Sequence, residues 1–225
     1  MKDDKTMPAS SVFDAITDAY DGWYDTTEGM AIFHDEVECL RRLDDFSGPW
    51  LEVGVGTGRF ADALGISHGV DLSPGMSIKA AGRGARVCVG RAEELPFPDQ
   101  AFDGVVMALT FCFLEKPEKA LGECARVLRE NGGLVVGTVP ADSPWGKAYI
   151  RKSAEGHPVY AHARFRAITE TVRLVEKTGF TLQRGCSSLF WGPGQPPAGC
   201  SRVEAGIIPE AGFIGLLFGV HPEGA

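Results

Sequence analysis

The chain has 225 residues, of which 44% are hydrophobic and 23% are charged. This length and composition are typical of a single globular domain that can bury a sizeable core. The formal net charge of −8 argues against a nucleic-acid or anionic-membrane partner, because backbone phosphates select basic surfaces. No apolar leader or apolar run long enough to span a membrane occurs. We therefore expect a cytoplasmic protein.

The potential metal ligands do not form a convincing site. None of the six cysteines forms a C-x-x-C pair, so the sequence indicates neither a zinc knuckle nor a redox dithiol. The acidic cluster of one predicted helix, with its histidine, is best interpreted as a solvated helix face; it consists of His34, Asp35, Glu36 and Glu38. The sequence therefore predicts no bound metal.

Two helices are predicted at the start of the chain. From residue 12, apolar side chains recur at helical spacing, at Phe13, Ile16, Tyr20 and Trp23. A second amphipathic helix is expected over residues 31–43, because the Gly-Pro pair that follows it is a stop signal. The first helix carries an unusually large number of aromatic rings.

A glycine-rich turn follows these helices. An apolar run ends in Glu52, and glycines then occupy alternate positions at Gly54, Gly56 and Gly58. The pattern predicts a strand, a tight turn and a helix, which together open a Rossmann-like βαβ unit. Glycine lets the backbone bend sharply there and lets a ligand approach the main chain closely.

The spacing of these glycines bears on the ligand. The dinucleotide fingerprint G-x-G-x-x-G would require glycine at the position of Arg59. Glu52, at the end of the strand, could instead meet an ammonium group such as that of S-adenosylmethionine (SAM). A glycine-rich turn in another kind of α/β protein remains open at this point.

An acid at the end of the next predicted strand supports a nucleoside ligand. Asp71 lies about 20 residues after the glycine turn, where a carboxylate hydrogen-bonds ribose hydroxyls in Rossmann-type sites. Ser73 is expected to cap a helix that Pro74 begins. Asp71 alone would be interpreted as an ordinary cap acid, but its distance from the glycine turn favours a ribose-binding role.

Three further segments follow in a recognisable order, at residues 92–97, 102–106 and 123–133. Together with the glycine turn and Asp71, they make the sequence resemble class I SAM-dependent methyltransferases. The resemblance is to the methyltransferase type 11 group, which includes the ubiquinone/menaquinone biosynthesis methyltransferases. It covers roughly residues 13–180.

The resemblance implies a Rossmann-like α/β fold of seven mostly parallel strands, with helices on both faces and the last strand antiparallel. Residues 102–110 read as a buried parallel strand because they are nearly continuously apolar. A helix is expected from Lys116 to a left-handed C-cap at Asn131, followed by a strand over residues 134–139. The last strand is predicted at residues 213–220.

The whole chain, residues 1–225, is predicted to be one domain. We expect residues 1–45 to form a helical lid, because the family uses a Tyr-Asp-x-Trp-Tyr stretch to close over the cofactor. Residues 140–166 are expected to form an insert on the side where the acceptor enters.

The resemblance further implies that SAM is the cofactor and S-adenosylhomocysteine the product. Many relatives carry an aspartate that accepts from the adenine amino group, but Arg91 at that position cannot accept a hydrogen bond. The predicted SAM site combines the lid, the glycine turn and the ends of three later strands; it consists of Tyr20, Tyr24, Glu52, Gly54, Gly56, Gly58, Asp71, Leu72, Met76, Ala92, Glu93 and Leu109.

The predicted insert is rich in aromatic and imidazole side chains, at Trp145, Tyr149, His157, Tyr160 and His162. A connection alone does not require them, which hints at a small apolar or aromatic acceptor. The two histidines are candidate general bases, because imidazole titrates near neutral pH. Ordinary surface histidines are the alternative for both.

Methyl transfer from SAM is an in-line displacement that depends mainly on positioning the acceptor. The sequence therefore predicts a SAM-dependent methyltransferase acting on a small molecule, without identifying the acceptor. A non-catalytic SAM-binding module, either a sensor or an assembly subunit, remains an alternative. An NAD(P)-dependent oxidoreductase is a weaker one, because Arg59 replaces a fingerprint glycine.

Overall fold

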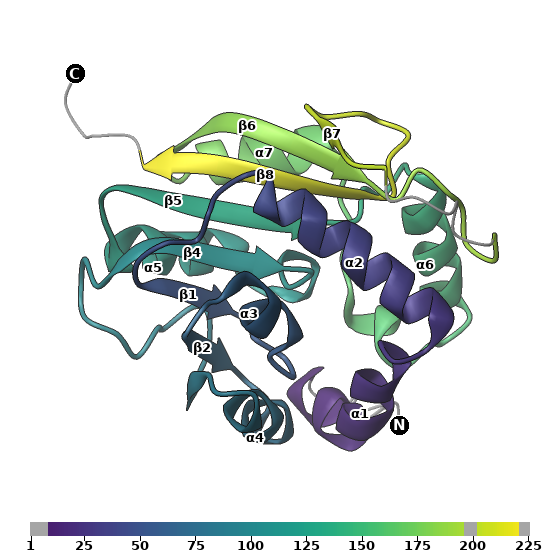
Figure 1. Cartoon of the computed structure of the whole chain (residues 1–225), viewed down its shortest axis with the longest axis horizontal. Coiled ribbons are helices and arrows are strands. Elements are labelled where there is room, and N and C mark those ends of the chain that lie inside the picture. The colour runs from purple at the N-terminus through teal and green to yellow at the C-terminus, as the bar shows by residue number, and fades with distance from the viewer. Residues whose placement is uncertain (1–8, 196–201, 221–225) are drawn as a thin grey trace, which may run out of the picture.

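The computed structural model describes residues 9–195 and 202–220, which form an eight-stranded sheet with helices on both faces (Figure 1). The strands are β1 (Trp50–Val53), β2 (His68–Asp71), β3 (Arg86–Val89), β4 (Phe102–Ala108), β5 (Leu128–Thr138), β6 (Phe180–Ser188), β7 (Glu204–Ala205) and β8 (Phe213–Val220). The helices are α1 (Ala9–Trp23), α2 (Thr27–Arg41), α3 (Arg59–Leu64), α4 (Pro74–Gly82), α5 (Pro117–Val127), α6 (Pro144–Ala154) and α7 (Ile168–Glu176), with short 3-10 turns η1 (Phe111–Phe113) and η2 (Tyr160–His162).

The strand order is β3-β2-β1-β4-β5-β8-β6-β7. Strands β1 to β5 pair in parallel, whereas β8 runs antiparallel to both β5 and β6. The predicted fold class is therefore confirmed. The sheet has one strand more than the expected seven, because the two-residue β7 pairs with β6 at the outer edge. A strand of two residues has no periodicity that the sequence could show.

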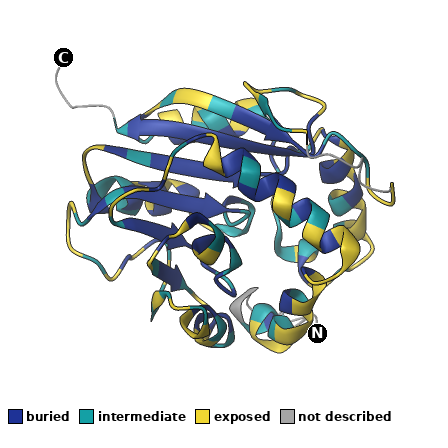
Figure 2. Ribbon diagram, viewed as in Figure 1, coloured by how far each residue is buried: buried dark blue, intermediate teal, exposed yellow. Residues whose placement is uncertain are grey.

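The two faces of the sheet bury separate cores. On one face, Val106 and Val135 pack in a cluster with residues of α2 and α3, and on the other, Val105 and Leu134 pack with residues of α5 and α7. This alternation follows from the pleat, because successive side chains of a strand point to opposite faces. The central strands are accordingly buried along most of their length (Figure 2). Within the described ranges, no helix combines the length and the apolar character needed to cross a membrane.

Helix boundaries follow their capping residues. The Ser73 hydroxyl accepts a hydrogen bond from the Met76 amide, as predicted for the cap of α4. Helix α2 begins at Thr27, four residues before the predicted start, because the Thr26 side chain accepts from the Gly29 amide. The cap, rather than the first apolar residue, therefore sets the start of this helix.

The predicted end of α5 is wrong. The helix ends at Val127, and β5 already begins at Leu128, which is buried and pairs with Phe102. Asn131 does adopt the expected left-handed conformation, with φ of 65°. It lies in an irregular stretch of the β4–β5 pairing, however, and not at a helix end. Tertiary pairing with β4 has thus converted the last predicted turn of helix into strand.

Charged contacts hold α1 against the rest of the fold. The Asp21 carboxylate accepts from Arg59 at 2.8 Å and from Arg83 at 3.0 Å. Asp14, two turns earlier, accepts from the Gly75 amide at 2.9 Å. The Arg59 guanidinium also lies 5.4 Å from the centre of the Tyr24 ring. Because the Asp21 side chain is only 12% exposed, its ion pairs are poorly screened by water.

Asp21 supports a prediction about the attachment of α1. Burial alone would raise the pKa of Asp21, but the hydrogen bonds from Arg59 and Arg83 outweigh it and hold this pKa well below its ordinary value of 3.8. We expect Asp21→Asn to loosen the docking of α1 by about 2 kcal/mol, the scale of hydrogen bonds to charged groups. Hydrogen exchange of the α1 amides should then accelerate by about 30-fold at neutral pH.

The pH dependence of this effect has a defined sign. Since the folded pKa of Asp21 is lowered, its contribution is present above the ordinary value of 3.8 and is lost as the pH falls further. The difference between the variant and the wild type should therefore shrink below about pH 4. Asp18→Asn is the matched control, because Asp18 is 95% exposed and its carboxylate lies 2.9 Å from the Lys79 ammonium. Equal exchange in the two variants would show that the ion pairs of Asp21 do not hold α1.

Candidate active site

A cavity of about 870 Å³ lies at the carboxyl ends of the parallel strands. In open α/β sheets, ligands bind at this edge, and the volume is within the range of small-molecule sites. The floor is built from the ends of β1, β2, β4 and β5 and from the segment after β3; its residues are Val53, Gly54, Val70, Asp71, Leu72, Gly90, Arg91, Ala92, Glu93, Ala108, Leu109, Thr110, Thr138 and Val139.

The three glycines of the turn after β1 serve different purposes. All have left-handed backbones, with φ of 74° at Gly54, 52° at Gly56 and 83° at Gly58. A Cβ on Gly54 would overlap the side chain of Thr110, and one on Gly58 would press on Ala80. A Cβ on Gly56 would meet no atom within 4 Å, and Gly56 borders the cavity. Its missing side chain therefore leaves room for a ligand.

Asp71 is held in place at the end of β2. One carboxylate oxygen accepts from the Gly56 amide and the other from the Ser73 amide, both at 2.8 Å. Burial raises the pKa of Asp71 despite these two bonds. Each oxygen keeps a further lone pair, so the carboxylate can still accept from a pair of hydroxyls in the cavity.

The structure brings together most of the residues predicted to bind the cofactor. Ten of them line the same cavity: Tyr20, Tyr24, Gly54, Gly56, Asp71, Leu72, Met76, Ala92, Glu93 and Leu109. Glu52 and Gly58 do not. Glu52 is 1% exposed, burial raises its pKa, and its Oε2 has no hydrogen-bond partner among the described residues. Direct contact of Glu52 with an ammonium group stays a prediction.

Helix α1 forms part of the roof. Tyr20 and Tyr24 line the cavity, their hydroxyls lie 3.1 Å apart, and burial raises the pKa of both phenols. Phe13 and Ile16, two of the apolar residues whose spacing predicted this helix, also line the cavity. The Phe13 ring meets the edge of Phe113, in η1, at a centroid distance of 5.2 Å. Helix α1 thus contributes several side chains to the roof of the site.

Arg91, which stands where many relatives carry an aspartate, lies near two glutamates. Its guanidinium lies 3.5 Å from Glu93 and 3.3 Å from Glu115. Glu93 is buried at the cavity wall, next to Ala92. Contact of these two residues with adenine stays a prediction.

The residues from 140 to 166 supply the opposite wall through α6 and η2. Trp145, Tyr149, His157 and Tyr160 line the cavity, whereas His162 does not. The rings of Tyr149 and Tyr160 stack at 4.5 Å. Burial and the charge of Lys152 lower the pKa of His157, which keeps this imidazole neutral near pH 7. His157 is therefore the better placed of the two candidate bases.

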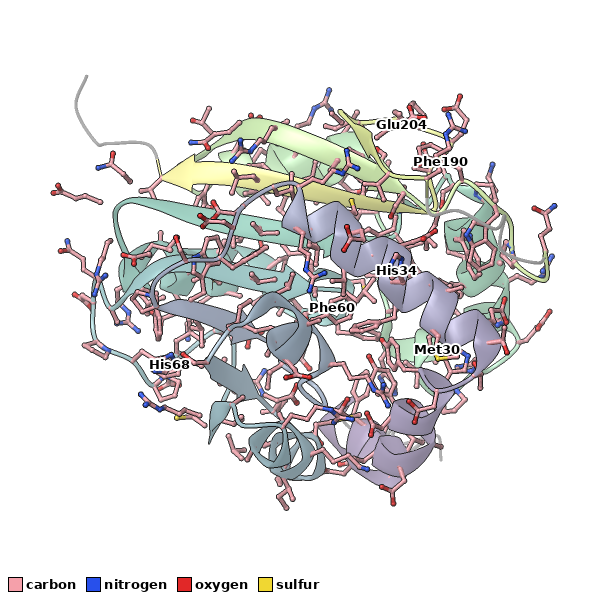
Figure 3. All side chains as sticks on the ribbon, in the orientation of Figure 1. Met30, His34, Phe60, His68, Phe190 and Glu204 are labelled. Atoms are coloured by element: carbon pink, nitrogen blue, oxygen red, sulfur yellow. The ribbon has the colours of Figure 1, made fainter. Side chains whose placement is uncertain are left out.

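Two further histidines of the described residues lie elsewhere. His34 and His68, labelled in Figure 3, belong to α2 and β2, and neither lines the cavity. Among the described residues, no group of three or more His, Cys, Asp or Glu side chains is arranged to hold a metal ion.

The interpretation of the acidic cluster on α2 as a solvated face is wrong for two of its members. His34 is exposed and Glu38 is half-buried, whereas Asp35 and Glu36 are buried. Asp35 accepts from the indole N–H of Trp191 at 3.2 Å. The helix therefore buries two carboxyl groups that the sequence analysis assigned to solvent.

Glu36 is a cavity residue that the sequence analysis missed. It borders the cavity, and burial together with the charge of Asp35 raises its pKa well above the ordinary value. A signal was present, because Ile32, Glu36 and Leu40 follow one another at intervals of four residues. That spacing places Glu36 on the buried stripe of α2.

Comparison with known proteins identifies the family. Residues 51–136 match the methyltransferase domain model. A crystal structure from Thermotoga maritima, described as a SAM-dependent methyltransferase and "possible histamine N-methyltransferase", superposes with a TM-score of 0.87. It is 32% identical, and the match covers 95% of this chain and 100% of that one.

Two sequence relatives extend the comparison. An uncharacterized protein of Mycobacterium tuberculosis is 39% identical over 95% of this chain and 75% of its own length. A demethylmenaquinone methyltransferase of Thermus thermophilus is 45% identical over 50% of this chain and 59% of its own length.

The chain therefore belongs to the SAM-dependent methyltransferases. SAM is its cofactor and methyl donor, as the resemblance implied. The residues fit this cofactor, because Gly56 leaves the cavity open over the turn and Asp71 presents free lone pairs beside it. Family membership also excludes the nicotinamide-dependent alternative.

Gly56 and Gly65 form a matched pair that tests the position of the cofactor. Both have left-handed backbones, and a Cβ on either meets nothing within 4 Å, but only Gly56 borders the cavity. We expect Gly56→Ala and Gly65→Ala each to cost about 1 kcal/mol of stability. Only Gly56→Ala should weaken S-adenosylhomocysteine binding, by tenfold or more in isothermal titration. Equal affinities in both variants would show that the ligand does not lie over this turn.

Proposed function

We propose that this methyltransferase transfers the methyl group to a small-molecule acceptor held beside SAM in the same cavity. One observation carries the proposal: the cavity continues without interruption from the glycine turn to an aromatic wall. We call this wall the aromatic half; it comprises Tyr20, Tyr24, Trp145, Tyr149, Tyr160 and Phe165. A site that bound SAM alone would need only the half formed by the strand ends.

The division of labour follows from the positions of the side chains. SAM, when bound, supplies a methyl group activated by its sulfonium, so the acceptor atom bonds to that carbon while the carbon–sulfur electron pair stays on sulfur. Asp71 and the turn at Gly56 are proposed to hold the donor at the strand ends. The aromatic half then restricts where the acceptor can lie, and positioning of this kind supplies much of the catalysis. Helices α1 and α2 contribute side chains to the cavity wall and are proposed to limit the access of water.

The lid and insert acquire roles in this scheme. We propose that residues 9–45, the described part of the predicted lid, and residues 144–162 of the insert together enclose the acceptor, because both contribute side chains to the cavity. Residues 1–8 of the predicted lid lie outside the described part of the chain. A buried chamber of this volume suits a small molecule and not a nucleic-acid strand.

The acceptors in the relatives' names differ from one another. The Thermus thermophilus relative is named for demethylmenaquinone, and the Thermotoga maritima structure for histamine as a possible acceptor. Because function resides in the site and not in the fold, neither name transfers directly. Both nevertheless support an acceptor that carries a flat ring, which the aromatic half would accommodate.

Binding and turnover test the proposal. We expect S-adenosylhomocysteine to bind the purified protein with a Kd of roughly 1–100 μM, near the usual range for metabolic enzymes, and NADH not to bind. With SAM and a mixture of small molecules, mass spectrometry should detect S-adenosylhomocysteine that accumulates only when an acceptor is present. Binding without turnover on any small-molecule extract would instead favour a non-catalytic SAM-binding module.

A further inference from the structure

Glu36 is the most informative unexplained group in the molecule. This residue of α2 is 2% exposed, it borders the cavity, and its Oε2 has no hydrogen-bond partner among the described residues. Burying a carboxyl oxygen without a partner costs several kcal/mol when the group is charged. Unpaired buried polar atoms in a site therefore call for a ligand that pairs with them.

Aromatic rings surround this carboxyl group. Burial is the main reason that the pKa values of the phenols of Tyr20, Tyr24, Tyr149 and Tyr160 are raised, and the charge of Glu36 raises each of them further. Glu36 therefore lies within electrostatic reach of all four hydroxyls. A carboxylate among aromatic faces is complementary to an organic cation, because the ring faces attract positive charge as well.

The charges that line the cavity also favour a cationic ligand. Five carboxyl groups border it, against two cationic side chains: Glu28, Glu36, Asp71, Glu93 and Glu115 against Arg91 and Lys152. Of the two cations, Arg91 pairs with Glu93 and Glu115, and the Lys152 ammonium lies over the rings of Tyr149 and Tyr160. Within the described part of the chain, neither cation forms an ion pair with Glu36. The burial-lowered pKa of His157 leaves that ring without a competing positive charge.

We propose that the methyl acceptor is an aromatic or apolar amine whose ammonium group pairs with Glu36. This inference rests on the proposed function and narrows its acceptor to one chemical class. An acidic acceptor would be repelled by Glu36. A neutral alcohol or quinol would bring no positive charge to offset the burial that raises the pKa of Glu36, so it would gain no ion pair there.

The proposal accounts for every proton and electron pair in the transfer. The bound ammonium gives one proton to the Glu36 carboxylate, which frees the lone pair of the nitrogen. That lone pair forms the new nitrogen–carbon bond, and the electron pair of the broken carbon–sulfur bond remains on sulfur. The product leaves as a methylammonium ion, and Glu36 returns its proton to solvent when the cavity opens. Burial and Asp35, which raise the pKa of Glu36, make its carboxylate a better proton acceptor.

Paired ligands provide the experiment. Calorimetry on the protein saturated with S-adenosylhomocysteine would compare 2-phenylethylamine with 2-phenylethanol, tryptamine with tryptophol, and benzylamine with benzyl alcohol. We expect at least one amine to bind tenfold or more tightly than its alcohol. Glu36→Gln should abolish this preference, while leaving the affinity for the alcohol and for S-adenosylhomocysteine within about twofold of the wild type.

Glu38→Gln is the matched control. Glu38 lies on the same helix, but its half-buried carboxylate pairs with Arg41 and does not border the cavity. The Glu38→Gln variant should bind the amines with the same affinity as the wild type. The preferred amine should also yield an N-methyl product with SAM, detected by mass spectrometry, and Glu36→Gln should lower this yield by at least tenfold.

The outcomes separate the two proposals. Failure of S-adenosylhomocysteine to bind the wild type would overturn the proposed donor site itself. Normal binding of S-adenosylhomocysteine, with no amine preferred over its alcohol, would overturn only the amine inference. If Glu36→Gln weakened the binding of S-adenosylhomocysteine as strongly as that of the amine, Glu36 would contact the donor and not the acceptor. The inference would then fail. A folding defect would be recognised by loss of alcohol and S-adenosylhomocysteine binding together, and Glu36→Asp would then be used to displace the carboxylate while keeping its charge.

Discussion

The site depends on the hydrogen bond between the Gly56 amide and the Asp71 carboxylate. It joins the turn after β1 to the end of β2, so that two neighbouring parallel strands present one continuous edge to the cavity. The turn can follow this path only because glycine tolerates a left-handed backbone. The same carboxylate also receives the Ser73 amide at the start of α4. Strand pairing, turn geometry and helix start therefore all converge on Asp71.

The roof of the cavity is held by charge and not by apolar packing alone. Asp21 joins α1 to Arg59 on α3 and to Arg83 after α4. Arg59 thus has a structural function at the position where a dinucleotide-binding protein would carry glycine. Because these partners are far apart in sequence, α1 is attached by the tertiary fold. Its attachment in turn keeps Tyr20 and Tyr24 over the cavity.

Much of the fold, and of the cavity floor built from the strand ends, could be predicted from the sequence, because both depend on local signals. The glycine turn, the Ser73 cap and the buried strand β4 each involve residues close together in the chain, and the structure contains all three. The predictions failed where distant pairing overrides local preference. Leu128 became strand because it pairs with Phe102, and β7 exists only because β6 offers it an edge.

The sequence by itself determined the family, the cofactor and the order of the elements, since a turn, a cap and an apolar period are properties of neighbouring residues. Only the tertiary structure decided which charged groups are buried. Glu36 and Glu38 are two residues apart on one helix, yet one borders the cavity while the other pairs with Arg41 at the surface. Whether a carboxyl group meets water depends on what packs against its helix. Here α1 and the much later elements α6 and η2 line the same cavity as Glu36. The aromatic half of the cavity is therefore a property of the assembled fold.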